Sequence, residues 1–386
     1  MKIGVASLGK TSEDTGGRNY IEHFFRTLST FDHGHEFVLF LSDDEASKID
    51  LGPRPPAIIS LRNTSASALR KVIGEQIFLP LAIKAAKIEL MYYPGNFASY
   101  ACPVPYVLNI RAVAHYYGRH YGIDWARRTM RKLLMPFSAS GAERIITPSQ
   151  DIKNDVVRFT GARREKIEVI PHGVDTTLFD GEVNRADLGG SEVLKRYGLR
   201  SNEYLLYVSA LWRYKNQDKL IRAHAELVRQ KKIKLPLVIA GLGTGTEPSY
   251  LSMLYAMPEA LGTKDLVIFT GQLPQSDLRY LYANARAFVF PSAYESFGNP
   301  IFESWASGIP IATANVHSFP EVVADAGVLF DPKNEQTFEE AILRVALDET
   351  LRKKIVALGK ERVRTYTWER SVGRTLSVLE SVKPFA

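Results

Sequence analysis

The stretch ARAFVFPSAYESFGNPIFESWASGIP, residues 285–310, has the pattern of a strand, a turn and a short helix in immediate succession. Its apolar run 285–292 is typical of a buried strand, which places Glu295 in the loop at the carboxyl end of that strand. Asn299 suits a helix N-cap and the proline after it suits the first helical position, so we expect a short helix over 300–307. The stretch therefore predicts one strand-to-helix step of an α/β fold.

The same rhythm repeats along the whole chain, because short apolar runs ending in small or turn residues alternate with helix-length segments. The runs lie at 2–8, 36–42, 88–94, 104–110, 144–149 and 167–173, and again at 203–210, 235–243, 266–271, 285–292, 309–314 and 326–332. Continuous apolar strands separated by helices are typical of parallel sheets covered on both faces. The fold class that we predict is α/β, with two successive Rossmann-like units.

A length of 386 residues suits two domains of ordinary size. We expect an N-terminal domain over 1–175, a polar linker over 176–202 and a C-terminal domain over 203–367. Open parallel sheets bind ligands at the carboxyl ends of their strands. Two such edges facing across a hinge would make a cleft.

The composition of the chain limits the chemical class of its binding partner and the cellular compartment in which we expect it. The only cysteine is Cys102, which excludes an internal disulfide and a cysteine metal cluster and suits a reducing cytoplasm. No apolar run approaches the ~18 residues of a membrane-spanning helix. The formal net charge of +7 favours an anionic partner, which leaves nucleic acid, phospholipid headgroups and phosphorylated small molecules open.

Two carboxylates, Glu295 and Glu303, lie on either side of the Ser-Phe-Gly-Asn-Pro turn. The N–H groups at the start of the expected helix, with the turn amides of Phe297 and Gly298, would form a corner suited to a phosphate. Taken singly, each acid has a plainer explanation. Glu295 could be a solvated loop residue, and Glu303 could compensate the helix dipole.

The stretch is similar to the E-x7-E region of the retaining glycosyltransferases of family four, F-P-S-x-x-E-S-F-G-x-P-x-x-E. These enzymes have the GT-B fold, two Rossmann-like domains facing across a cleft that holds a nucleoside diphosphate sugar. The resemblance implies that Glu295 contacts hydroxyls of the donor sugar and that Glu303 holds the ribose hydroxyls. The backbone that it assigns to the diphosphate is that of Ser296, Phe297, Gly298 and Asn299.

The stretch YVSALWRYKNQDKLIRAH, residues 207–224, resembles the segment in which a basic pair of this family faces the diphosphate. Lys215 matches that pattern, whereas Ala210 stands where the family has arginine, so we expect Arg213 to supply the second charge. Negative charge grows on a departing diphosphate, and fixed cations stabilise it without a metal. The acidic SDDE at 42–45 is better explained as a solvated loop than as a metal site, so we expect no bound metal.

In the N-terminal half, Gly16 and Gly17 resemble the glycine pair with which the family approaches the diphosphate; an ordinary flexible turn is the alternative. One departure concerns the histidine that many members place near the reacting sugar. Arg111 occupies its position, and His115 follows four residues later. Either side chain is a candidate for the catalytic face. The family's last helix, expected here at about 368–386, packs back on the N-terminal domain.

The segment 116–137 interleaves cations with large apolar side chains. On a helix this mixture suits an anionic membrane surface, although a helix that covers a sheet also needs an apolar side. We therefore expect a cytoplasmic protein that binds the inner face of the membrane peripherally, or one whose segment is only structural.

The resemblance predicts a retaining, metal-independent transferase that moves a hexose from a UDP- or GDP-sugar. The acceptor would be a glycan, a lipid-linked molecule or a small molecule of envelope polysaccharide or glycoconjugate synthesis. The donor is a substrate, and no further cofactor is expected. Two alternatives stay open: a catalytically silent nucleotide-binding subunit and a GT-B epimerase. Nucleic acid has only the net charge in its favour, and we expect it not to be a partner.

Overall fold

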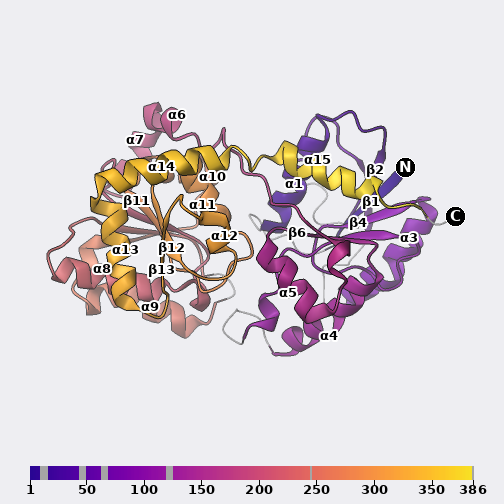
Figure 1. Cartoon of the computed structure of the whole chain (residues 1–386), viewed down its shortest axis with the longest axis horizontal. Coiled ribbons are helices and arrows are strands. Elements are labelled where there is room, and N and C mark those ends of the chain that lie inside the picture. Colours follow the sequence, from indigo (N-terminus) through magenta and orange to yellow (C-terminus); the bar gives the residue numbers. More distant parts are fainter. Residues whose placement is uncertain (9–15, 43–48, 62–67, 119–124, 244–245, 385–386) are drawn as a thin grey trace. The chain divides into compact units, whose positions relative to one another are not determined.

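The computed structural model describes residues 1–8, 16–42, 49–61, 68–118, 125–243 and 246–384. The described residues fall into two compact units (Figure 1). Unit 1 comprises Met1–Tyr116, Trp125–Gly173 and Trp368–Ala386, and unit 2 comprises Tyr117–Asp124 and Val174–Thr367.

Unit 1 is built on a parallel sheet in the order β3-β2-β1-β4-β5-β6-β7. Its strands are β1 (Lys2–Ser7), β2 (Glu36–Ser42), β3 (Ala57–Leu61), β4 (Leu90–Tyr93), β5 (Tyr106–Asn109), β6 (Arg144–Thr147) and β7 (Ile167–Val169). In the centre of the sheet, Val5 lies opposite both Leu39 and Tyr92, and all three are fully buried. Strands buried on both faces explain why the sequence shows continuous apolar runs rather than alternation.

Helices on both faces of this sheet complete unit 1 (Figure 1). They are α1 (Gly16–Leu28), α2 (Ala68–Ile73), the π-helical turn η1 (Gly74–Phe78), α3 (Leu79–Ala85), η2 (Ala114–Tyr116), α4 (Trp125–Gly141), α5 (Gln150–Thr160), η3 (Arg164–Lys166) and α15 (Trp368–Glu380). The helix α15 packs on α1, and Val372 and Leu376 join the same core as Phe24. The end of the chain is thus part of the N-terminal unit, as Figure 1 shows by its yellow helix.

Unit 2 repeats the plan with a parallel sheet in the order β10-β9-β8-β11-β12-β13. Its strands are β8 (Leu205–Val208), β9 (Leu237–Ala240), β10 (Val267–Gly271), β11 (Ala287–Phe290), β12 (Ile311–Ala314) and β13 (Val328–Phe330). Its helices are α6 (Gly181–Ala186), α7 (Leu188–Arg196), η4 (Arg213–Lys215), α8 (Gln217–Arg229), α9 (Pro248–Ala260), η5 (Lys264–Leu266), α10 (Gln275–Asn284), α11 (Asn299–Ala306), α12 (Phe319–Val323), α13 (Glu335–Leu347) and α14 (Glu349–Val363). The two α/β sheets confirm the predicted fold class.

The stretch 176–202, which we expected to be a linker, holds α6 and α7 and belongs to unit 2. The Arg185 guanidinium on α6 donates to the Ala283 carbonyl at 2.7 Å and to the Ser307 carbonyl at 3.2 Å. Gly181, the first residue of α6, lies so close to Ser307 that a Cβ there would be 1.9 Å from the Ser307 carbonyl oxygen. Val193 and Leu194 of α7 also join the hydrophobic core of unit 2, so apolar side chains and a close backbone approach together hold this stretch.

Among the described residues, no helix combines the length and the apolar character needed to cross a bilayer.

Candidate functional site

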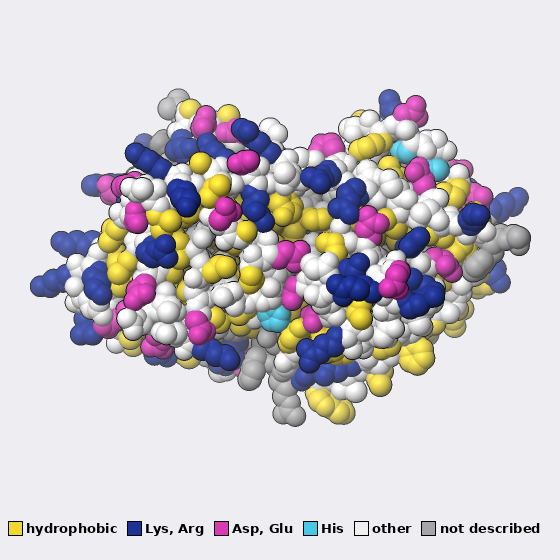
Figure 2. Space-filling model, viewed as in Figure 1, with side chains coloured by type: hydrophobic (Ala, Val, Ile, Leu, Met, Phe, Trp, Pro, Cys, Tyr) yellow, Lys and Arg dark blue, Asp and Glu magenta, His cyan; other side chains and the backbone are white. Residues whose placement is uncertain are grey.

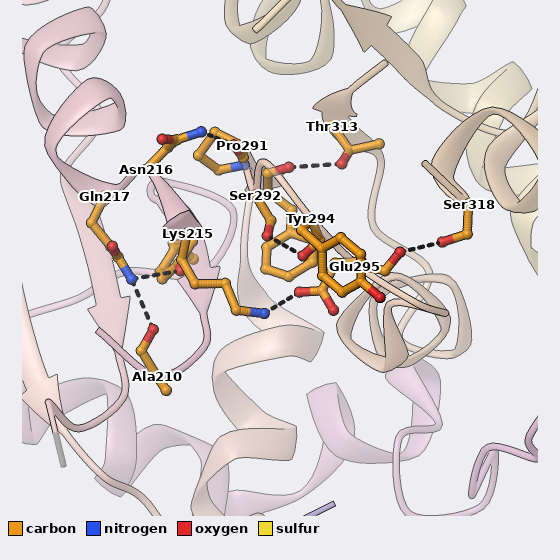
Figure 3. Close-up of polar contacts among 12 residues, drawn as sticks. Ala210, Lys215, Asn216, Gln217, Pro291, Ser292, Tyr294, Glu295, Thr313 and Ser318 are labelled. Atoms are coloured by element: carbon orange, nitrogen blue, oxygen red, sulfur yellow. Dashed lines mark hydrogen bonds and ion pairs between the residues drawn. The ribbon is translucent and has the colours of Figure 1, made fainter. Parts of the chain in front are cut away.

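Two loops meet at the carboxyl ends of neighbouring strands in unit 2. The loop after β8 carries Lys215, and the loop after β11 carries Glu295; the two strands pair in parallel. The ammonium of Lys215 forms an ion pair with the carboxylate of Glu295 (Figure 3). Parallel strands place their carboxyl ends at one edge, so residues 80 apart in the sequence become partners.

Lys215 is only 7% exposed, which is unusual for a lysine. Its Nζ lies 5.1 Å from the centre of the Tyr214 ring and 5.5 Å from that of Phe290. Aromatic faces attract a cation, and burial strengthens its field on any anion that reaches it. Lys215 is therefore a fixed positive charge at the sheet edge.

Buried hydroxyls fix the loop that carries Glu295 (Figure 3). Ser318 Oγ donates to the Glu295 carbonyl at 3.0 Å, and Ser292 Oγ donates to the Tyr294 carbonyl at 2.9 Å. Thr313 Oγ1 donates to the Phe290 carbonyl at 2.7 Å. Each bond satisfies a carbonyl that would otherwise be costly to bury, so the loop keeps one conformation.

A second network holds the loop after β8. Gln217 is fully buried, and its side-chain nitrogen Nε2 donates to the Ala210 carbonyl at 2.9 Å and to the Tyr207 hydroxyl at 2.8 Å. The Tyr250 hydroxyl donates to the Gln217 oxygen at 3.2 Å. The neighbouring Asn216 has a positive φ of 57° and donates to the Pro291 carbonyl at 2.7 Å, which ties the two loops together.

Arg213 takes a different course from Lys215. Its guanidinium lies over the Tyr250 ring, 4.6 Å from the centre, and pairs with Glu247 at 3.1 Å. About half of its side chain is exposed. Two cations in one turn thus have separate anionic partners, and only Lys215 pairs with Glu295.

The turn before α11 differs from the expected capping. The helix begins at Asn299, and the cap position belongs to Gly298, whose φ of 85° lies in the left-handed region. A Cβ at Gly298 would approach the Phe319 ring to 2.9 Å, so both the backbone and the packing require glycine. The Ile301 N–H, which we expected to be available, donates to the Gly298 carbonyl at 2.9 Å.

Glu303 lies beyond the first turn of α11, so charge compensation at the helix start does not explain it. Burial raises the pKa of its carboxyl from 4.5 to about 7, and the Tyr282 hydroxyl acts in the opposite direction. A carboxyl group that titrates near neutral pH inside a binding edge is a candidate ligand group.

In unit 1, Gly16 and Gly17 begin α1, while the loop 9–15 before them lies outside the described residues. Arg111 follows β5, and its guanidinium lies 5.4 Å from the centre of the Tyr20 ring. Burial, together with the charge of Arg111, lowers the pKa of the nearby His172 to about 3, so this imidazole is neutral. Arg111 is therefore the cation at this edge of the first sheet.

His115 is packed in the interior beneath α4. It is 3% exposed, and its ring lies 4.5 Å from that of Tyr116. Burial lowers its pKa to about 4, with the charges of Arg131, Lys132 and Arg128 acting in the same direction. It is a neutral core side chain at physiological pH.

Three residues of this network, Tyr207, Gln217 and Tyr250, were not among those predicted from the sequence. Gln217 begins α8 two residues after Lys215, so its closeness to the predicted cation was a usable signal. Tyr250 carried none, because only the fold brings α9 beside α8.

Both halves of the chain match sequence families of glycosyltransferases. Residues 15–178 match the family described as "Glycosyltransferase Family 4", and residues 194–362 match "Glycosyl transferases group 1". The O-antigen chain mannosyltransferase B of Escherichia coli is 30% identical over 241 residues, 62% of this chain and 61% of the relative. The D-inositol 3-phosphate glycosyltransferase of Thermobifida fusca is 30% identical over 242 residues, 61% of this chain and 54% of the relative. The match thus spans little more than half the length of these relatives.

Solved structures share the architecture at low sequence identity. Anabaena HepE, solved with UDP and glucose, superposes with a TM-score of 0.77 at 18% identity and covers 99% of this chain and 100% of its own. The lipopolysaccharide glycosyltransferase WaaG has a TM-score of 0.73 at 15% identity, over 98% of this chain and 100% of its own. These neighbours have the GT-B fold. With matches in both halves, the chain belongs to the family four glycosyltransferases.

Proposed function

We propose that the protein transfers a hexose from a UDP- or GDP-sugar to an acceptor, with retention at the anomeric carbon and without a metal. The observation that carries the proposal is the buried Lys215–Glu295 pair at the carboxyl edge of the second sheet. A fixed cation and a fixed carboxylate side by side suit a ligand that has both phosphate and hydroxyl groups. The UDP-glucose complex of HepE is a precedent for such a donor.

Lys215 would stabilise the negative charge that grows on the departing diphosphate, since a desolvated cation acts strongly there without reorganising. Arg213 would support it from a more exposed position, after exchanging Glu247 for phosphate. Glu295 would accept from sugar hydroxyls, and the backbone from Ser296 to Asn299 would contact the phosphates. The resemblance to family four implies that the leaving phosphate oxygen would help to deprotonate the acceptor, so no carboxylate nucleophile would be needed.

Glu303 would hold the ribose, because an ionised carboxylate can accept both hydrogen bonds of a vicinal diol. On the first unit, Gly16 and Gly17 would approach the diphosphate closely. Arg111 would face the donor in place of the usual histidine, and the interior position of His115 supports this choice over His115.

The acceptor would be a glycan, a lipid-linked molecule or a small molecule. The relatives named as an O-antigen chain mannosyltransferase and an inositol phosphate glycosyltransferase favour envelope polysaccharide or glycoconjugate synthesis. We further propose that the protein works in the cytoplasm and docks on the inner face of the membrane through 116–137. Of that segment, 119–124 lies outside the described residues.

A catalytically silent subunit is the main alternative, because Arg111 stands where many members have histidine. A GT-B epimerase would bind the same donor but release no sugar to an acceptor. The test is a thermal-shift screen of UDP- and GDP-sugars in EDTA, followed by detection of the free nucleoside diphosphate. A ligand at 100 times its dissociation constant stabilises by roughly 2.7 kcal/mol. Stabilisation without product in the presence of candidate acceptors would favour the silent subunit, and no stabilisation by any donor would contradict the proposal.

A further inference from the structure

The helix α4 of unit 1 turns its apolar stripe outward. Met130, Leu133 and Phe137 are 46%, 63% and 65% exposed, and their spacing of three and four residues places them on one face. Met135 and Ala139, on the opposite side, are buried against the unit. The stripe therefore does not serve to cover the sheet, which was the plainer of the two explanations of this segment.

A second exposed apolar segment lies beside it, and the sequence pattern did not predict it. The turn η1 and the start of α3 expose Ile77 by 52%, Phe78 by 49% and Leu81 by 60%. A π-helical turn shifts the helix face by one residue, so these side chains leave the buried side, which Leu79 and Ile83 keep.

Tyr100 joins the two segments. Its N–H donates to the Gln76 side chain of η1 at 2.9 Å, and its hydroxyl donates to the Leu134 carbonyl of α4 at 3.2 Å. Its ring meets that of Phe137 with 6.4 Å between centres. The exposed side chains of η1–α3 and α4 thus form one surface, which we name the apolar face.

Cations flank the apolar face. Arg128, Arg131 and Lys132 lie along α4, half-buried, and Arg70 is exposed on α2. Arg128 donates to the His115 carbonyl at 2.9 Å, so this charge is held in place. Figure 2 shows hydrophobic side chains next to Lys and Arg side chains over α4, at the lower edge of this unit.

We propose that the apolar face docks on an anionic lipid surface, with η1–α3 and α4 inserted side by side. A monomeric protein rarely leaves so continuous an apolar surface uncovered. A second copy of the chain would bring the same cations opposite each other, whereas anionic headgroups neutralise them. Two parallel contacts fix the orientation of unit 1 on the membrane, which a single helix could not do. The proposal deepens the membrane location given above and does not depend on sugar transfer.

The test is co-sedimentation of the whole protein with vesicles of phosphatidylcholine alone or mixed with an equal part of phosphatidylglycerol. We expect binding to the mixed vesicles that weakens in high salt. Leu133→Gln on α4 and Leu81→Gln on α3 should each reduce binding about tenfold, because each removes one buried apolar side chain from the interface. Leu347→Gln on unit 2, at 52% exposure, is the matched control and should change nothing.

The cation arm compares Arg131→Gln with Arg222→Gln, an exposed arginine of α8. Only the first should lower binding to mixed vesicles. Equal binding to both vesicle types, or normal binding by Leu81→Gln, would overturn the proposal. Self-association in sedimentation velocity that Leu133→Gln abolishes, without vesicle binding, would show that a second copy covers the face. The assay contains no donor, so its failure leaves the transferase proposal untouched.

Discussion

At the scale of single residues, the site depends on a buried cation and on two carboxylates in different environments. Glu295 is kept beside Lys215, whereas burial raises the pKa of Glu303 to about 7. The sequence predicts that both acids flank the turn between β11 and α11. It does not show that Glu295 is paired with Lys215 or that the pKa of Glu303 is raised, because pairing and burial depend on residues far along the chain.

The raised pKa of Glu303 predicts a pH-dependent affinity for nucleotide. In the proposed role, only the ionised form of Glu303 would accept both ribose hydrogen bonds, so binding of free UDP or GDP should tighten several-fold between pH 6 and pH 8. Calorimetry with the free nucleotide measures this, and Glu303→Gln should bind weakly with a flat profile. A wild-type affinity that is constant over this range would show that Glu303 does not hold the ribose.

The same shift affects stability. A carboxyl whose folded pKa is raised favours folding below its ordinary pKa of 4.5, and this contribution is lost as the pH rises through about 7. Denaturation by urea should therefore show Glu303→Gln gaining stability relative to the wild type between pH 5 and pH 8. If the difference is independent of pH, Glu303 does not titrate in this window.

Removing Glu295 leaves Lys215 buried without its partner. Loss of one member of a buried pair costs about 3 kcal/mol, and somewhat less where one partner is partly exposed. We expect Glu295→Ala to lower the unfolding free energy by ~2 kcal/mol in urea denaturation. The double variant Glu295→Leu with Lys215→Met should recover most of it. A double variant less stable than Glu295→Ala would show that the pair is not the cause.

At the scale of elements, local chemistry predicted much of the strand, turn and helix over 285–310. The apolar run gave β11, and the proline gave the start of α11 within a residue. The prediction that Asn299 is the N-cap of this helix was wrong. Gly298 takes it rather than Asn299, because Phe319, far along the chain, leaves no room for a side chain at that turn. Contacts of this kind cannot be read from a local pattern.

This turn allows backbone strain to be separated from packing. Gly298 and Gly161 both have positive φ, at 85° and 72°, but nothing lies within 4 Å of a Cβ at Gly161. Gly161→Ala should cost about 1 kcal/mol from the backbone alone, and Gly298→Ala clearly more. Only Gly298→Ala should also weaken nucleotide binding. Equal losses of stability, measured by urea denaturation, would show that Phe319 adjusts freely.

Gln217 predicts how the loop after β8 is held. Gln217→Leu removes three buried hydrogen bonds, to the Ala210 carbonyl and to the hydroxyls of Tyr207 and Tyr250, at a cost of ~1 to 3 kcal/mol. Because the same loop carries Lys215, turnover should fall more than donor affinity. Gln336→Leu, at an exposed position, is the control. Unchanged stability and turnover would mean that water replaces the Gln217 amide.

At the scale of the whole molecule, the repeated strand rhythm predicted two parallel α/β units, and the structure and its GT-B neighbours confirm this fold. The stretch 176–202 was harder, since its polar composition concealed a few buried apolar side chains, such as Val193 and Leu194, and the close backbone approach of Gly181. The outward stripe of α4 was also beyond the pattern. An amphipathic sequence fixes that a helix has two faces, but not which face meets the unit.

The proposed transfer depends most on Lys215, which would stabilise the charge on a departing nucleoside diphosphate. The measurement is the rate at which the wild type and Lys215→Met release the nucleoside diphosphate in EDTA. The donor is the nucleotide sugar that stabilises the protein in the thermal-shift screen. We predict turnover by the wild type and a loss of about a hundredfold or more in kcat for the variant, with a much smaller change in KM. Activity that requires a divalent metal, or a Lys215→Met variant as fast as the wild type, would contradict this role of Lys215.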